Sequence, residues 1–208
     1  MKNRRTILPI SIIIAFLIVS WEQVNAQKLE LSPFVGYETG AKLSSNLGTL
    51  HISDGMALGA SFDVGIGGGR YGEFSYSHMG TSLNLKEGLA NQRLCNLAVN
   101  YFSLGVLQEI KPDAKATPYG LFTLGIVNYH PTTGDFSSEN KMHISVAGGI
   151  KIRASERLGI RFQARLLMPL SNAGNYFSAG TGGAGYGISG GIQGVQGDLT
   201  AALVLKLK

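Results

Sequence analysis

The stretch from residue 159 to residue 169 alternates apolar and polar side chains with a period of two. Apolar side chains occupy every second position, at Ile160, Phe162, Ala164, Leu166 and Met168. The positions between them carry Arg161, Gln163 and Arg165. Successive side chains of a β-strand point to opposite faces of the sheet. The stretch therefore predicts a strand with one apolar face and one face that carries guanidinium groups.

The same pattern recurs in segments of about ten residues that are bounded by Gly, Pro, Asn, Asp or Ser. Eight such segments are found, at residues 28–38, 55–66, 70–80, 93–108, 116–128, 142–153, 157–168 and 195–207. After residue 27, no segment has the periodicity of an amphipathic helix or an apolar run of about 18 residues, which excludes a helical membrane protein. The sequence therefore predicts an all-β chain of eight strands.

The connections between these segments alternate in length. Short connections lie at residues 67–69, 109–116 and 154–157, and long ones lie near residues 39–54, 81–92, 129–141 and 169–194. In an up-and-down meander every second connection lies at the same end, so one end is tight and the other is elaborate. Outer-membrane barrels have this asymmetry, with short periplasmic turns and long external loops.

The composition of the two faces indicates which one is inside. In the segment 142–153, one face carries Met142, Ile144, Val146, Ile150 and Ile152, and the other carries His143, Ser145, Ala147, Gly149, Lys151 and Arg153. The polar faces consist mostly of small residues with few charges, which suits the narrow interior of an eight-stranded barrel. The apolar faces then meet lipid. We expect an eight-stranded antiparallel up-and-down transmembrane β-barrel.

Two further features of the segments carry structural predictions. Tyrosines lie near segment ends, at Tyr37, Tyr71, Tyr119 and Tyr129. We expect them to form the aromatic girdles that mark the two membrane interfaces. In the segment 93–108, the apolar residues change parity around Tyr101 and Phe102, which predicts a β-bulge at that point.

The charged side chains of the polar faces predict a plug inside the barrel. Arg161 and Arg165 have inward parity, and the acidic residues with the same parity are Asp63, Glu73 and Asp198, with Glu30 as a further candidate. Charges of opposite sign inside the lumen are able to pair, whereas a charge facing lipid near the midplane costs about 2 to 4 kcal/mol. We therefore expect a network of ion pairs that fills the bore.

The first 26 residues are interpreted separately from the fold. A positively charged head precedes an apolar core at residues 7–19, and small residues follow from Val24 to Ala26. This is the pattern of a secretory signal peptide that is cleaved before Gln27. The expected organisation is a cleaved segment over residues 1–26 and one barrel domain over residues 27–208.

Charge and cysteine content argue against several kinds of site. The chain has 18 Lys and Arg against 13 Asp and Glu. After the expected signal peptide its charges are scattered singly and form no Lys- or Arg-rich run, so nucleic acid is not expected as a partner. The single cysteine, Cys95, cannot form an internal disulfide and is interpreted as a packed thiol. The four histidines and Cys95 lack the spacing of a metal site, so neither a metal nor a cofactor is expected.

Four stretches of the chain resemble a known family. They read LSPFVGYETG, YGLFTLGI, GGIKIRASERLGIRFQARLLMP and GISGGIQGVQGDLTAALVLKLK. They are similar to outer-membrane β-barrel proteins of bacteria related to Bacteroidota, in the superfamily of small eight-stranded barrels that includes OmpA-like and OmpX-like proteins. The resemblance implies the Gram-negative outer membrane as location, with its lipid and the barrel-assembly machinery as partners. The shared motifs mark strands and turns and imply no catalytic residue.

Two motifs carry candidate chemistry. The sequence GYGISG at residues 185–190 matches a dinucleotide-binding pattern, but it lies in a glycine-rich stretch with no following helix, which indicates an external loop. His143 and Ser145 share one face, as the base and nucleophile of a hydrolase require. Their inward parity and the lack of an acidic partner favour hydrogen bonding within the lumen.

We expect a non-enzymatic, monomeric outer-membrane barrel that is plugged by its lumen charges and displays long loops for envelope integrity or surface interaction. The loop 171–194 contains candidate contact residues at Asn172, Asn175, Tyr176 and Phe177. The alternative is a narrow pore or conduit for small solutes or apolar molecules. A second alternative is a lipid-modifying hydrolase that uses His143 and Ser145.

Overall fold

The computed structural model describes residues 28–45, 48–87, 90–112, 114–133, 137–170 and 195–207, and the structural statements below refer to these residues. The expected signal peptide at residues 1–26 lies outside them. So does the loop 171–194, with the GYGISG motif and the candidate contact residues Asn172, Asn175, Tyr176 and Phe177.

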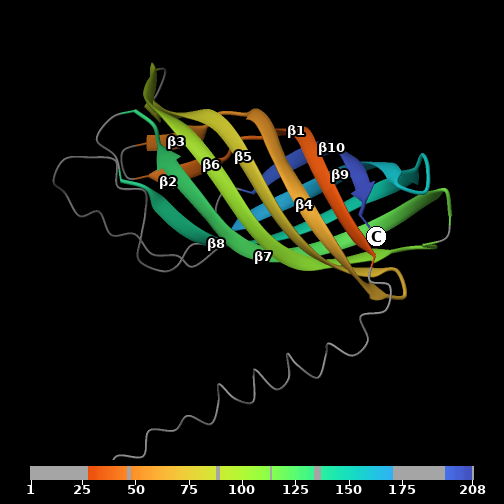
Figure 1. The fold of residues 1–208 in the computed structure, drawn as a ribbon. Helices are drawn as coiled ribbons and strands as arrows, with labels where there is room; N and C mark the ends of the chain where they lie inside the picture. The colour runs from red at the N-terminus through yellow and green to blue at the C-terminus, as the bar shows by residue number, and fades with distance from the viewer. Residues whose placement is uncertain are drawn as a thin grey trace, which may run out of the picture.

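The described chain forms one antiparallel sheet that closes on itself (Figure 1). Its strands are β1 Leu29–Glu38, β2 Lys42–Ser45, β3 Gly48–Ile52, β4 Gly55–Gly67, β5 Arg70–Glu87, β6 Ala90–Glu109, β7 Ala116–Pro131, β8 Glu139–Arg153, β9 Leu158–Pro169 and β10 Gln196–Lys206. The strands β4 to β10 pair in sequence order, and β1 closes the ring between β4 and β10. The predicted eight-stranded up-and-down barrel is therefore confirmed. Among the described residues, no helix is long and apolar enough to cross a membrane.

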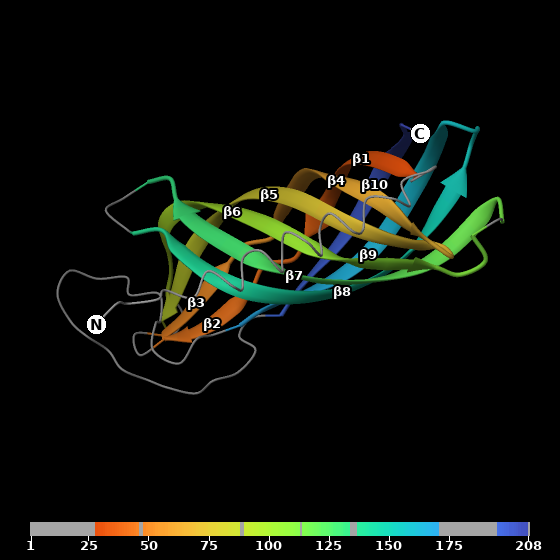
Figure 2. The same cartoon turned by 60° about the horizontal axis from the view of Figure 1, so that its bottom comes forward.

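The two ends of the barrel differ (Figures 1 and 2). The connections β4–β5, β6–β7 and β8–β9 lie at one end, together with the end of β10, and we call this the turn end. The short strands β2 and β3 lie at the opposite, loop end. At the turn end, Gly67, Gly68 and Gly69 all have positive φ, of 102°, 62° and 72°. A side chain rarely adopts that conformation, which explains the run of three glycines.

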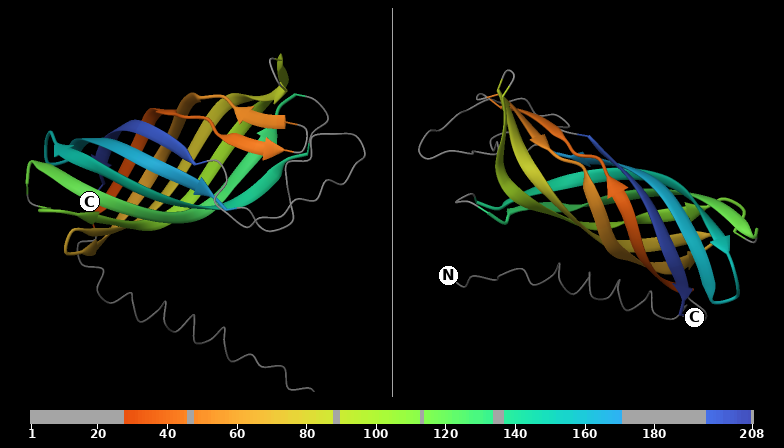
Figure 3. Two further views of the ribbon diagram at one scale, coloured as in Figure 1. Left: turned by 180° about the vertical axis from the view of Figure 1, so that it is seen from behind. Right: turned by 90° about the horizontal axis from the view of Figure 1, so that it is seen from above.

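The loop end is built from longer strands than the sequence predicts. The expected long connection at residues 81–92 is mostly strand, because β5 continues to Glu87 and β6 begins at Ala90. At the loop end, β4 begins only at Gly55. Beyond that residue, β3 pairs with β5 in place of β4, with Ile52 opposite Leu83 and Leu50 opposite Leu85. The β2–β3 hairpin thus extends one wall of the barrel, as the views in Figure 3 show.

The outward face of the barrel carries an apolar band. Every strand of the closed ring contributes exposed apolar side chains, among them Leu31, Leu58, Phe74, Leu104, Leu124, Val146, Leu166 and Leu199. The inward face carries buried polar and charged side chains, including Ser61, Glu73, Ser103, Thr123, Ser145 and Arg161. The predicted assignment of the apolar face to the outside is confirmed.

The predicted bulge at Tyr101 and Phe102 is wrong. The two residues sit in regular register opposite Ser77 and Tyr76, and the irregularity in this strand pair lies at Leu83 and Asn84 of β5. Parity changes for another reason, because the lumen of the loop end is itself apolar. Phe102 points outward and is 46% exposed, whereas Tyr101 points inward and is buried.

The predicted aromatic girdles are also wrong for three of the four tyrosines. Tyr71, Tyr119 and Tyr129 are buried, and only Tyr37, at 53% exposure, lies on the outer surface. The three buried tyrosines do lie near strand ends, but their parity turns them into the lumen. There their rings and hydroxyl groups contact other lumen side chains, as Tyr119 does when it donates to Gln163 over 3.0 Å.

Candidate functional site

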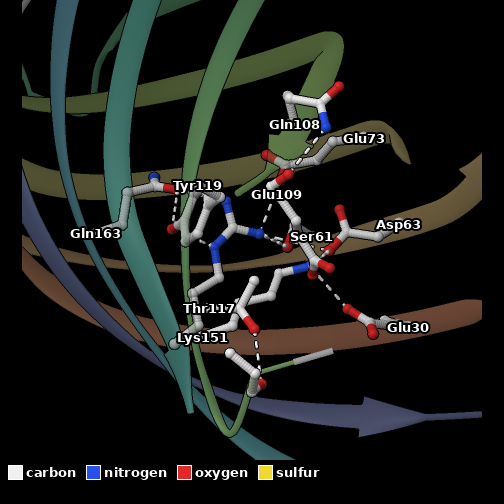
Figure 4. Close-up of polar contacts among 12 residues, drawn as sticks. Glu30, Ser61, Asp63, Glu73, Gln108, Glu109, Thr117, Tyr119, Lys151 and Gln163 are labelled. Atoms are coloured by element: carbon white, nitrogen blue, oxygen red, sulfur yellow. Dashed lines mark hydrogen bonds and ion pairs between the residues drawn. The ribbon is translucent and has the colours of Figure 1, made fainter. Parts of the chain in front are cut away.

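The lumen is filled by layers of different chemistry. Toward the turn end lies a charge layer, made of Glu30, Asp63, Glu73, Glu109, Lys151 and Arg161. Figure 4 shows Glu30, Asp63, Glu73, Glu109, Tyr119 and Lys151 converging inside the barrel from different strands. All six members of the charge layer are at most 5% exposed. This is the densest group of titratable side chains in the described chain and forms the candidate site.

Arg161 holds one side of the charge layer together. Its Nη1 lies 2.8 Å from Glu73 Oε2 and 3.5 Å from Asp63 Oδ2. Its Nε donates to the Tyr119 hydroxyl over 2.7 Å, and its Nη2 contacts Gln163. These partners lie on β4, β5, β7 and β9. One guanidinium therefore ties together strands on different sides of the ring.

Lys151 forms the other half of the layer. Its Nζ lies 2.8 Å from Glu30 Oε2, 3.4 Å from Glu109 Oε1 and 3.6 Å from Asp63 Oδ2. It also lies 4.4 Å from the centre of the Tyr71 ring, within the range of a cation–π contact. The predicted network did not include Lys151 or Glu109. The inward parity of Lys151 was visible in the sequence, whereas Glu109 was assigned to the predicted connection 109–116 and is in fact the last residue of β6.

Arg165 and Asp198 form a separate pair nearer the middle of the barrel. Arg165 Nε donates to Asp198 Oδ2 over 2.7 Å, across the β9–β10 pairing. Beside them, Gln196 accepts a hydrogen bond of 2.6 Å from Tyr101 and donates to Glu38 over 3.3 Å. The structure thus places all five predicted network residues in the lumen. It divides them into two clusters, one around Arg161 and one around Arg165.

Carboxylates outnumber cations in the described lumen. The buried acids are Glu30, Glu38, Asp63, Glu73, Glu109 and Asp198, and the buried bases are Lys151, Arg161 and Arg165. Within the described chain, Asp63 Oδ1, Asp198 Oδ1 and Glu109 Oε2 are buried without a hydrogen-bond partner. Buried charges are stabilised only when they are paired. The lumen of the described chain therefore holds more acidic than basic side chains.

His143 and Ser145 lie in a polar layer of the lumen, but each has a different partner. His143 Nε2 is 3.0 Å from Ser103 Oγ, and the Ser145 hydroxyl is 2.6 Å from the Thr123 hydroxyl. Both residues are fully buried. A hydrolytic site needs a nucleophile in contact with its base and open to substrate. The contact of Ser145 instead joins the neighbouring strands β7 and β8, and the contact of His143 reaches from β8 past β7 to β6.

The loop end of the lumen contains an apolar layer. Its members are Ala41, Leu50, Ile52, Met79, Leu83, Cys95, Leu97, Val99, Tyr101, Val127, Tyr129 and Leu167. Cys95 is buried within it, as predicted for a packed thiol. Among the described residues, no group of three or more His, Cys, Asp or Glu side chains is arranged to hold a metal ion.

Comparisons with known proteins place the fold. No protein-family model and no curated protein matches the sequence. Among solved structures, the chain is similar to Neisserial surface protein A, with 13% identity over 86% of this chain and 97% of that one, and a TM-score of 0.58. OprG from Pseudomonas aeruginosa matches with 8% identity over 87% and 94%, at a TM-score of 0.58. The outer membrane protein AlkL matches with 11% identity over 88% and 90%, also at 0.58. These likenesses confirm the barrel fold that the sequence resemblance implies.

Proposed function

We propose that this chain, which has the fold of the small eight-stranded outer-membrane barrels, is a non-enzymatic integral protein of the Gram-negative outer membrane. Its lumen is plugged, and its loop end is presented at the cell surface. The apolar band supports the membrane placement, because exposed side chains such as Leu104 and Leu199, each 66% exposed, are stable in contact with hydrocarbon. A closed ring also leaves no unpaired strand edge in lipid.

The observation that carries the proposal is the double filling of the lumen. The charge layer is at most 5% exposed and the apolar layer at most 4%. An eight-stranded barrel is just wide enough for side chains to fill its interior. A solute that crosses the barrel would have to displace both an ion-pair cluster and a packed apolar cluster.

The contacts of His143 and Ser145 support a structural role for both residues. Each hydroxyl or imidazole group is paired across strands within the lumen, away from the lipid that a membrane hydrolase would act on. The role of the loop 171–194 in surface contact, a monomeric state and passage through the barrel-assembly machinery remain predictions.

The test is the conductance of the refolded mature protein in planar lipid bilayers. Heat-modifiable migration in gels must first show that the barrel is folded. We expect a folded barrel without steady single-channel steps. Steady steps from folded protein would contradict the plug and would favour the pore or conduit.

A further inference from the structure

The outward face of β5 to β8 changes from apolar to polar between two successive rows of paired residues. The row nearer the turn end consists of Tyr76, Phe102, Ile126 and Met142, which lie opposite one another in register. The next row of outward-facing residues, toward the loop end, consists of His78, Asn100, Asn128 and Asn140, again in register. We call these four residues the amide row.

The amide row contains two hydrogen-bonded pairs, His78 with Asn100 and Asn128 with Asn140. Asn100 Oδ1 accepts from the Tyr76 hydroxyl over 2.9 Å and lies 2.8 Å from His78 Nδ1. Asn128 donates to Asn140 over 2.7 Å. Amide and imidazole groups at this position suit the polar interface of a membrane better than its hydrocarbon core. If the band below is in lipid, as the proposed function requires, the amide row marks the outer edge of the hydrocarbon.

A polar groove lies directly above the amide row, on the outer face of β5 and β6. It has a volume of about 520 Å³, and its lining includes His78, Ser53, Asp54, Ser82, Arg93 and Asn96. Its floor contains two small outward residues, Gly80 and Ala98, which are paired across β5 and β6. A Cβ atom added to Gly80 would meet no atom within 4 Å, so the space above the floor is open.

The groove combines hydroxyl, amide, carboxylate and guanidinium groups. Arg93 is exposed and donates one hydrogen bond to Asn96, and a guanidinium has five N–H donors in all. Asp54 is fixed by a 2.7 Å hydrogen bond from the Gly40 amide. Such a set of groups matches a saccharide that bears an anionic phosphate, with arginine as the phosphate contact.

The surface beneath the groove indicates that the ligand is amphipathic. The Tyr76 and Phe102 rings lie 5.0 Å apart just below the amide row, and both are outward and exposed. An acyl chain that descends from the groove would follow these rings and Phe74 into the apolar band. A free sugar or a free anion would leave that surface unused.

We infer that this groove binds the phosphorylated sugar headgroup of an outer-leaflet glycolipid, whose acyl chains lie against Tyr76 and Phe102. The inference rests on the proposed function for the placement in the membrane. It adds a lipid-binding site that the lumen plug does not require, on the opposite side of the barrel wall.

Native mass spectrometry of the refolded protein in phosphatidylcholine nanodiscs tests the inference. The probes are a bisphosphorylated glucosamine-disaccharide lipid (lipid A), phosphatidylglycerol and inorganic phosphate. We expect the parent to retain lipid A at least about fivefold better than phosphatidylglycerol. Equal retention of the two lipids, or displacement of lipid A by inorganic phosphate alone, would overturn a headgroup site.

Two matched glycine variants locate the site. Gly80 and Gly120 are both outward strand residues at which an added Cβ meets nothing within 4 Å, but only Gly80 lines the groove. We expect Gly80→Leu to abolish the preference for lipid A and Gly120→Leu to keep it. Arg93→Gln should weaken retention about fivefold, the equivalent of about 1 kcal/mol. The same retention in both glycine variants would place the lipid elsewhere and overturn the inference.

The outcome is separable from that of the proposed function. A barrel that is folded and silent in bilayers but shows no preference for lipid A contradicts the groove and leaves the plug intact. A barrel that conducts yet binds lipid A through Gly80 and Arg93 contradicts the plug and supports the groove.

Discussion

Arg161 is one lumen residue that contacts side chains from several strands. Its guanidinium contacts Glu73, Asp63 and Tyr119 while it is only 4% exposed. A buried charge in this position is stable only because its partners are present, and the reverse holds for the partners. The consequences of changing single residues therefore depend on what each change leaves unpaired.

Arg161→Ala should destabilise the barrel strongly. It leaves Glu73 and Asp63 buried without their guanidinium partner, a change that costs about 3 to 5 kcal/mol in typical buried pairs. The measurement is the free energy of unfolding in urea, followed by heat-modifiable migration in gels. Arg157→Ala is the matched control, because Arg157 lies in the exposed β8–β9 turn. Equal stability of the two variants would contradict the charge layer as described.

Ser145→Ala should have a small effect on stability and none on lipid. The change removes one hydrogen bond to Thr123 and costs about 1 kcal/mol. In a strain that carries the variant, we expect lipid profiles identical to those of the parent. Loss of a lipid product in the variant, with the barrel still folded, would reinstate the hydrolase.

Tyr37→Phe should raise the pKa of Asp54 toward its ordinary value. That pKa is lowered first by the hydrogen bond from the Gly40 amide and then by the one from the Tyr37 hydroxyl, 2.9 Å away. The contact therefore stabilises the β3–β4 connection above the ordinary pKa of aspartate and is lost as the pH falls through the lowered value. Carboxyl NMR titration measures the shift. Tyr76→Phe removes a hydroxyl that donates to Asn100 and should leave Asp54 unchanged.

At the scale of elements, the two halves of β6 place their apolar side chains on opposite faces. In its turn-end half, Phe102, Leu104 and Val106 point outward and are exposed. In its loop-end half, Leu97, Val99 and Tyr101 point inward and are buried. The backbone register stays regular through the change. The strand β6 therefore has an apolar outer face within the apolar band and an apolar inner face beyond it.

This division predicts different costs for the same substitution at two outward positions of β6. Leu104→Arg places a charge in the apolar band and should cost about 2 to 4 kcal/mol of folding free energy in bilayers. Ala98→Arg lies above the amide row and should cost about 1 kcal/mol or less. Equilibrium refolding into lipid vesicles from urea measures both. Similar costs would show that the hydrocarbon boundary is not at the amide row.

For the whole molecule, the imbalance between lumen acids and bases determines what a leak would carry. Six buried carboxylates face three buried cations in the described lumen. A path that opens along the charge layer would bring water to these carboxyl groups, and carboxylates that ionise in water attract cations and repel anions.

If the loss of the Arg161 side chain opens the charge layer, the Arg161→Ala variant should conduct and should prefer cations. The reversal potential across a bilayer in a potassium chloride gradient gives the sign of the preference. The parent and Arg157→Ala should both remain silent under the same conditions. An anion-selective current would contradict the described charge balance.

The number of barrel strands, their inward and outward faces and the identity of most lumen charges were predictable from the sequence. These features depend on the two-residue period of an extended backbone, which is local and can be read along the chain. Arg161, Asp63 and Glu73 all follow it. Tyr119 and Tyr129 follow it too, because their inward parity, and not their position near a strand end, determines that their rings lie in the lumen.

Only the tertiary structure decided which charges meet and where the lumen changes character. Lys151 on β8 contacts Glu30 on β1 because ring closure brings strands that are distant in sequence across one narrow bore. The apolar layer exists because β5 and β6 extend beyond the band and β3 pairs with the extended part of β5. A local alternation specifies which side chains share a face, but the register and closure of the ring specify which of them come into contact.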